Sequence, residues 1–224
     1  MVIWSFLLGC ARVAANMAVA MSYKTPFVLP PPHLRKSADT AKVQLSLGCE
    51  SDQLTVHYLL ETRTSLMKGN SHQRQGSFAD FCRKNFVGPN TIQMIAEVRK
   101  NLTRELSMLG FPSPSMTSQQ SNQRPGGKDN NLSYHNRHDN DHALWQAAIA
   151  GGLYPNVCFR KRGDTNFSTM TNQKVKVHVS SVNAIRGQPL NSKCDVPKGL
   201  LEFVCFGEMV KGTGMSINTS KELK

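Results

Sequence analysis

The chain has 224 residues, of which 39% are hydrophobic and 19% charged, and this ordinary globular composition excludes a wholly disordered protein. The net charge of +12 favours polyanionic partners, with nucleic acid ahead of anionic membrane surfaces. The six cysteines are widely spaced and form no CxxC pair, so we expect free, mostly buried thiols and an intracellular protein.

The first 21 residues are apolar, and we expect a buried helix over residues 3–20. A signal peptide needs a basic region before its apolar core, and a membrane-spanning helix needs about 20 residues free of charge. Arg12 and Asn16 interrupt this segment instead. A membrane anchor or secretory signal is therefore the least favoured reading.

Several further helices are expected in the first half of the chain. One covers residues 35–47, the next starts with Ser51 and Asp52 as its cap, and a short aromatic one covers residues 78–86. The clearest helix has apolar residues at three- and four-residue steps, namely Ile92, Ile95, Val98, Leu102, Leu106 and Leu109. We expect Asn90 or Thr91 to cap it and Gly110 to end it.

Residues 112–141 are rich in Pro, Ser, Gln, Asn and Gly, which predicts a disordered polar linker. At its end, His135, His138 and His142 are spaced so that they can share one helical face. Zinc ligands are held by a rigid frame and a second shell of hydrogen bonds, which a flexible linker does not supply. We therefore favour a solvated loop and predict no metal site.

After a short helix over residues 143–150, ended by Gly151 and Gly152, the pattern changes to strands. Residues 174–179 alternate valine with a basic residue, and residues 200–206 and 215–217 read as further strands. Several short strands in a segment with 11 basic and 5 acidic residues indicate a small, basic β-barrel. The fold class is thus α+β.

Particular strings resemble the C-terminal region of DEAH/RHA-type ATP-dependent RNA helicases, in the RNA helicase A-like branch. They occur in the family's order and lie at Gly9–Cys10 and residues 18–29, 51–54, 81–86, 91–99, 148–157, 177–183 and 200–220. The resemblance implies a helicase-associated, ratchet-like helical region over residues 1–111, truncated at its start. It implies an oligonucleotide-binding (OB) fold over residues 142–224, ending just before the family's last barrel strand.

The family's motor is not recognisable in this sequence. No G-x-x-x-x-G-K-[ST] loop and no Asp-Glu-x-His string occurs, so no triphosphate and Mg²⁺ site is expected. We therefore expect no cofactor and no independent catalysis from this chain; ATP and Mg²⁺ would belong to the motor of the full-length family. The chain is read as a fragment, a split subunit or a degenerate relative.

The resemblance implies contact with single-stranded RNA around residues 174–181. Lys174 and Lys176 supply charge, His178 can stack on or hydrogen-bond a base, and Ser180 and Ser181 can bond phosphate. A second basic run consists of Arg160, Lys161 and Arg162.

Each of these sites has a plainer alternative: the serines hold a turn together, and the basic run is a solvated loop. The competing function is a protein-interaction region that docks on a separate helicase motor or ribonucleoprotein partner without touching RNA. An exposed apolar face on residues 3–20 would favour it. Nucleus, cytoplasm and mitochondrion are not distinguished.

Overall fold

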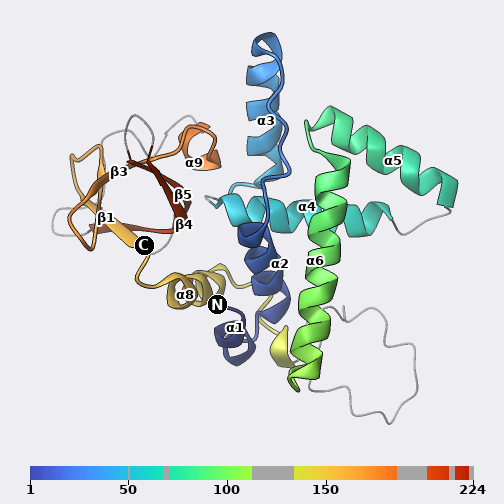
Figure 1. The fold of residues 1–224 in the computed structure, drawn as a ribbon, viewed down its shortest axis with the longest axis horizontal. Coiled ribbons are helices and arrows are strands. Elements are labelled where there is room, and N and C mark those ends of the chain that lie inside the picture. Colours follow the sequence, from blue (N-terminus) through green and yellow to red (C-terminus); the bar gives the residue numbers. More distant parts are fainter. Residues whose placement is uncertain (50, 68–70, 113–133, 186–200, 212–214, 222–224) are drawn as a thin grey trace.

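The computed structural model describes residues 1–49, 51–67, 71–112, 134–185, 201–211 and 215–221. A group of helices occupies one side of the molecule and a β-barrel the other, with α8 (His142–Leu153) beneath the barrel (Figure 1). No helix among these residues is long and apolar enough to cross a membrane. The α+β class and the order of helices before barrel are confirmed.

The expected first helix is in fact two helices, α1 (Val2–Leu8) and α2 (Ala11–Ser22). Gly9 separates them with φ of 71°, a left-handed conformation that glycine adopts readily. Apolar content alone did not reveal this break. α2 is the central helix, with Val13, Ala14 and Met17 fully buried, and it packs against α4 and α6.

The next helices lie where the sequence predicts helices, but the one expected over residues 78–86 begins at Ser71 and ends at Lys84. A 3-10 turn (Pro32–Leu34) leads into α3 (Arg35–Leu45), and α4 (Asp52–Leu66) is followed by α5 (Ser71–Lys84). The predicted cap of α4 is confirmed, since the Ser51 side chain accepts a hydrogen bond from the Leu54 amide at 3.2 Å.

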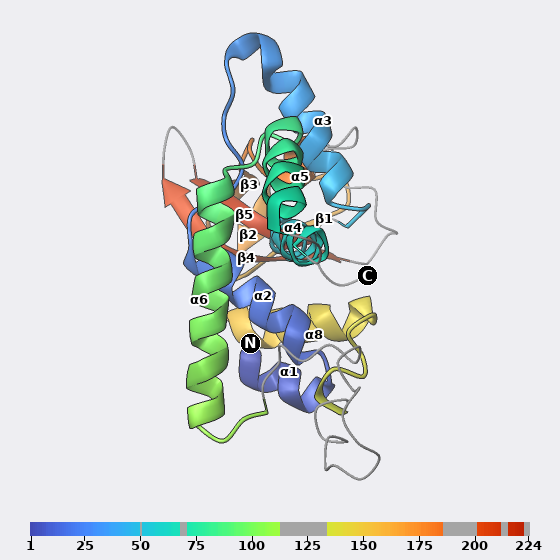
Figure 2. The ribbon, with the colours of Figure 1, turned by 90° about the vertical axis from the view of Figure 1, so that its right-hand side faces the viewer.

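The longest helix, α6 (Pro89–Met108), runs along one side of the molecule (Figure 2). Its predicted cap at Asn90 or Thr91 is wrong, because Gly88 precedes it and Pro89 supplies a first position that needs no amide partner. The stop is confirmed by Gly110, whose φ is 83°. The apolar stripe is buried at Ile92, Ile95 and Leu106 but ends before Leu109, which is exposed.

Residues 134–141, expected to belong to the linker, contact the first two helices. The His138 amide donates to the Gly9 carbonyl at 2.8 Å, and Asp139 forms an ion pair with Arg12 at 2.7 Å. Asp141 then caps α8, which continues through the two glycines expected to end it. Residues 113–133 of the predicted linker lie outside the described part of the chain.

The barrel is closed within the described residues, with strand order β1-β2-β3-β5-β4. The strands are β1 (Val157–Lys161), β2 (Phe167–Thr169), β3 (Lys174–Val177), β4 (Leu201–Lys211) and β5 (Met215–Lys221). β1 pairs with both β2 and β4, and β3 runs parallel to β5. The OB-type barrel that the sequence led us to expect is thus closed by these five described strands.

The barrel interior holds inward-facing residues from every strand, with Cys158, Phe167, Val175, Val177 and Ile217 among them. The five cysteines that the structure describes are free thiols, four of them buried, which confirms the prediction for those positions. Cys194 lies outside the described residues. Burial raises the pKa of Cys158 to about 12, so this thiol stays protonated at neutral pH.

Candidate nucleic-acid interface

The outer face of β3 carries two exposed lysines. Lys174 and Lys176 face solvent, while Val175 and Val177, which alternate with them, are buried in the barrel. The register sets Lys174 opposite Ser168 on β2 and Lys176 opposite Ser216 on β5. The alternation that predicted one apolar and one basic face is confirmed, and both lysines belong to one surface.

The strand ends at Val177, so the alternation does not continue through Val179, which is 78% exposed. The chain turns here. The Ser180 amide donates to His178 Nδ1 at 3.2 Å, and the Ser180 hydroxyl lies 2.7 Å from the same nitrogen. With Nδ1 accepting, the neutral ring of His178 carries its proton on Nε2 and presents that atom as a donor.

Ser181 does not belong to this exposed group, because it is only 1% exposed and its hydroxyl donates to the Asp52 carboxylate. The Val182 amide donates to the same carboxylate at 2.9 Å, and Lys42 Nζ lies 3.2 Å from it. Lys42 also donates to the Ser180 carbonyl. We call these contacts the Asp52 clamp; they join the His178–Ser181 turn of the barrel to α3 and α4.

The three residues of the run Arg160–Lys161–Arg162 lie in different environments, one buried and two exposed. Arg160 is 5% exposed, forms an ion pair with Glu202, and lies with its guanidinium carbon 4.5 Å from the centroid of the Phe167 ring. This side chain is therefore engaged inside the protein rather than offered to a phosphate. Lys161 and Arg162 are exposed at the end of β1, on the loop toward β2.

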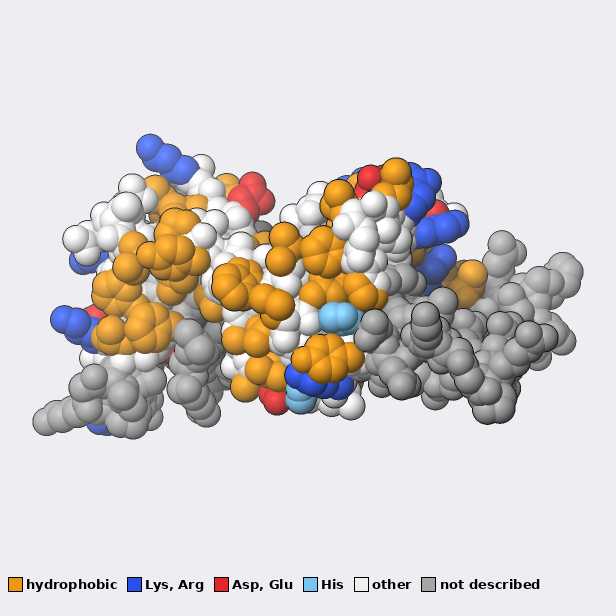
Figure 3. Space-filling view, turned by 90° about the horizontal axis from the view of Figure 1, so that it is seen from below, with side chains coloured by type: hydrophobic (Ala, Val, Ile, Leu, Met, Phe, Trp, Pro, Cys, Tyr) orange, Lys and Arg blue, Asp and Glu red, His pale blue; other side chains and the backbone are white. Residues whose placement is uncertain are grey.

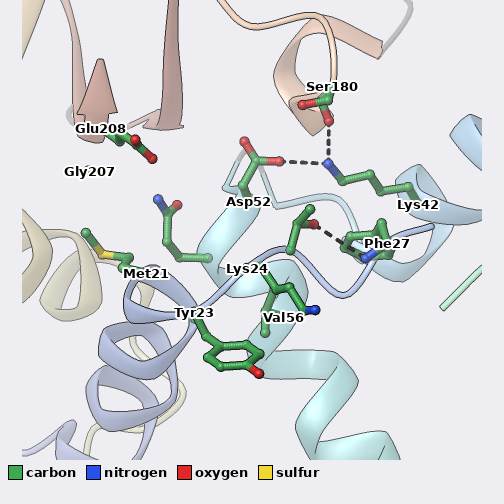
Figure 4. Close-up of a pocket in the computed structure, with 13 residues that line it drawn as sticks. Met21, Tyr23, Lys24, Phe27, Lys42, Asp52, Val56, Ser180, Gly207 and Glu208 are labelled. Carbon is green, nitrogen blue, oxygen red and sulfur yellow. Dashed lines mark hydrogen bonds and ion pairs between the residues drawn. The ribbon is translucent and has the colours of Figure 1, made fainter. Parts of the chain in front are cut away.

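A cavity of about 280 Å³ lies at the junction of the helices and the barrel. In Figure 4, Gly207 and Glu208 come from β4, Met21 from the end of α2, and Asp52 and Val56 from α4. Tyr23, Lys24 and Ser180 also line it. The cavity thus opens beside the His178–Ser181 turn.

A cluster of charged and polar side chains, some buried and some partly exposed, lies between α2, α4 and residues 134–141. Arg12 pairs with Glu61 and Asp139, each at 2.7 Å, and Asn16 Nδ2 lies 2.8 Å from His57 Nδ1. Burial lowers the pKa of His57 to about 4, and the nearby arginines act in the same direction. We assign this cluster to holding the helices together.

The three histidines considered as metal ligands do not converge. His135 Nδ1 lies 3.1 Å from the Phe6 carbonyl, His138 lies close to Gly9, and the His142 ring packs on Trp145 with centroids 4.3 Å apart. Across the described residues, no group of three metal-binding side chains is close enough to hold an ion.

Sequence reasoning missed Lys42, Asp52 as a clamp residue, and the cavity-lining Glu208. Asp52 and Ser181 both fall in strings that resemble the helicase family, yet they are 129 positions apart, so local pattern gave no sign of their contact. Covariation between these positions in an alignment is the signal that can reveal such a pair.

The chain is similar both to a known domain family and to individual helicases. Residues 145–223 match the family described as oligonucleotide/oligosaccharide-binding (OB)-fold. The chain is 29% identical over 216 residues to DExH-box ATP-dependent RNA helicase DExH1 of Arabidopsis thaliana. This match covers 96% of this chain and 18% of the relative.

Two further relatives cover a similar part of the chain. Identity is 28% over 192 residues with ATP-dependent DNA/RNA helicase DHX36 of Homo sapiens, covering 82% of this chain and 17% of the relative. It is 28% over 195 residues with ATP-dependent RNA helicase DHX29 of Mus musculus, covering 82% and 13% respectively. The chain spans less than a fifth of the length of these relatives.

Proposed function

We propose that this chain, which corresponds to the C-terminal helical and OB-fold region of DExH/DEAH-type RNA helicases, binds single-stranded RNA through the outer face of its barrel. The observation that carries the proposal is the exposed pair Lys174 and Lys176 beside His178. Two ammonium groups attract the phosphates of a strand, and an imidazole can stack on a base or donate to it.

The structure changes which residues we include in this contact. Lys174, Lys176, His178 and the Ser180 hydroxyl remain, and exposed Lys161 and Arg162 extend the basic surface around the barrel. Arg160 and Ser181 are assigned to internal contacts with Glu202 and Asp52. Replacing Arg160 or Ser181 is expected to lower the stability of the fold, and to affect RNA binding only through that loss.

The chain is proposed to act as an accessory region within an ATP-dependent helicase, as an intracellular protein. Since the sequence has no phosphate-binding loop and no Asp-Glu-x-His string, we expect no ATP hydrolysis from this chain alone. Unwinding would be the work of a motor, in the same polypeptide or in a separate one.

The test is the salt dependence of binding to a fluorescent single-stranded RNA. The slope of log affinity against log salt is negative, and each phosphate contact that is lost reduces its magnitude by about 0.7. The double replacement Lys174→Gln with Lys176→Gln should therefore reduce the magnitude of the slope by about 1.4. The matched control is Lys36→Gln with Lys100→Gln, two exposed lysines on α3 and α6, which should leave the slope unchanged.

His178→Ala should weaken binding without changing that slope, because a stacked or hydrogen-bonded ring releases no counterion. Equal slopes for the wild type and the β3 double variant would move the contact away from this strand. An affinity absent even at low salt would remove the RNA-binding proposal altogether.

A second candidate, docking on a separate motor or ribonucleoprotein partner, is favoured by the surface of α1. Ile3, Trp4 and Leu7 are 63%, 53% and 67% exposed, which is unusual for side chains of this size gathered on one helix. Figure 3 looks at this end of the molecule and shows apolar side chains spread across it. Calorimetry with a purified motor polypeptide, comparing the wild type with Leu7→Glu, tests it: no heat of binding rejects that partner.

A further inference from the structure

The junction cavity is positioned to receive part of an RNA strand that crosses β3. Ser180 lines the cavity, and its hydroxyl contacts the ring of His178, which follows the two lysines of β3. Through Ser180, the cavity therefore adjoins the turn that follows the exposed lysines of β3. Residues from the helices form the opposite wall (Figure 4).

The size of the cavity limits what can enter. Its volume is about 280 Å³. Pockets for drug-sized ligands usually span about 300–1,000 Å³, so this one suits a single planar base rather than several. Tyr23 lines it and also packs against the core of the helical part, which gives an aromatic side chain with a fixed position for stacking.

The charges around the cavity disfavour a phosphate inside it. Lys42 is engaged by Asp52 and by the Ser180 carbonyl, so its charge is already compensated. Glu208 is exposed and lines the cavity, and its carboxylate repels phosphate but accepts hydrogen bonds. Lys24, also exposed on the lining, can meet the phosphate that stays outside.

A β-bulge shapes the wall that carries this carboxylate. The pairing of β4 with β5 shifts between Phe206 and Glu208, so Gly207 is the extra residue of the bulge. A Cβ at Gly207 would lie 2.8 Å from Met21 Cε, which shows how closely the barrel backbone approaches α2. The bulge turns Glu208 toward the junction.

We propose that this cavity binds one base of the RNA strand, and that Glu208 makes it select a base with hydrogen-bond donors on its Watson–Crick edge. Guanine suits it best, since N1–H and the N2 amino group are two adjacent donors for one carboxylate. Uracil offers a single donor between two acceptors and is disfavoured. The inference rests on the proposed RNA binding and adds a base preference to it.

The experiment compares two fluorescent ten-nucleotide RNAs, oligouridine and the same strand with one central guanosine, on the full chain. The wild type should bind the guanosine-containing strand about tenfold more tightly, as expected for one bidentate contact. Glu208→Gln should reduce that ratio to about one to two, because an amide has only one acceptor oxygen. The matched control Glu97→Gln removes a charge from α6, outside the cavity, and should keep the wild-type ratio.

Photo-crosslinking with 6-thioguanosine at the central position gives a second readout, with crosslinks expected within residues 20–27 or 207–208. Equal binding of the two RNAs by the wild type, an unchanged ratio in Glu208→Gln, or crosslinks confined to other segments would overturn the base pocket while leaving RNA binding in place. No binding of either RNA would overturn both.

Discussion

Replacing Asp52 by alanine should destabilise the junction between the helices and the barrel. The Asp52 carboxylate accepts from the Ser181 hydroxyl and the Val182 amide, and pairs with Lys42. The paired side chains of Lys42 and Asp52 are 12% and 18% exposed, so water screens them only in part. Hydrogen bonds to a charged group contribute about 1.5–3 kcal/mol each, and partly exposed partners regain some of this from water. We therefore expect a loss of about 3 kcal/mol.

For a chain of this size, that loss corresponds to a fall in Tm of about 6–12 °C. Differential scanning calorimetry measures it, with Asp39→Ala as the matched control, since Asp39 is an exposed carboxylate on α3. A Tm for Asp52→Ala within 1–2 °C of the control, roughly a ΔΔG of 0.5 kcal/mol, would refute the clamp.

The clamp also predicts how two substitutions combine in RNA binding. Asp52 holds the turn that carries His178, so Asp52→Ala should also remove the contribution of the His178 ring to RNA affinity. At a temperature where both variants are folded, adding His178→Ala to Asp52→Ala should then weaken RNA binding less than His178→Ala does alone. Strictly additive effects would show that the turn keeps its geometry without Asp52.

Two further predictions concern the helical part. Burial lowers the pKa of His57 to about 4 from an ordinary 6.5, so its contribution to stability is complete above pH 6.5 and is lost as the pH falls toward 4. The loss amounts to about 3 kcal/mol, and denaturant titrations at several pH values should show a flatter pH dependence for His57→Gln. Gly9→Ala and Gly110→Ala both place alanine at a φ above 70°, but the new Cβ at Gly9 lies 3.0 Å from Arg137 Cγ whereas at Gly110 nothing lies within 4 Å. Gly110→Ala should lower the free energy of unfolding by about 1–2 kcal/mol through backbone strain alone. Gly9→Ala should lower it further, because of the contact with Arg137. Equal losses for the two variants in denaturant titrations would show that residues 134–138 shift to accommodate the new Cβ with no loss of stability.

Much of the fold was predictable because it depends on neighbours in the chain. The stripe of α6, the Ser51 cap of α4 and the Lys–Val alternation of β3 are all local patterns, and the structure confirms each. Two failures were local too, but finer: Gly9 divides an apolar run that reads as one helix, and Pro89 rather than a polar cap begins α6. A third was not local, because residues 134–141, expected to belong to the linker, contact the first two helices.

The candidate site likewise combines features that are visible in the local sequence with contacts that only the folded chain creates. The sequence by itself determined that the chain is basic, that β3 has a lysine face, and that its ordered strings resemble those of RNA helicases. It could not show that Arg160 pairs with Glu202, or that Asp52 reaches Ser181, because each depends on two segments brought together by closure of the barrel or by its docking on α3 and α4. Whether a polar side chain meets RNA or a partner inside the protein is decided by burial, and burial is a property of the packed chain.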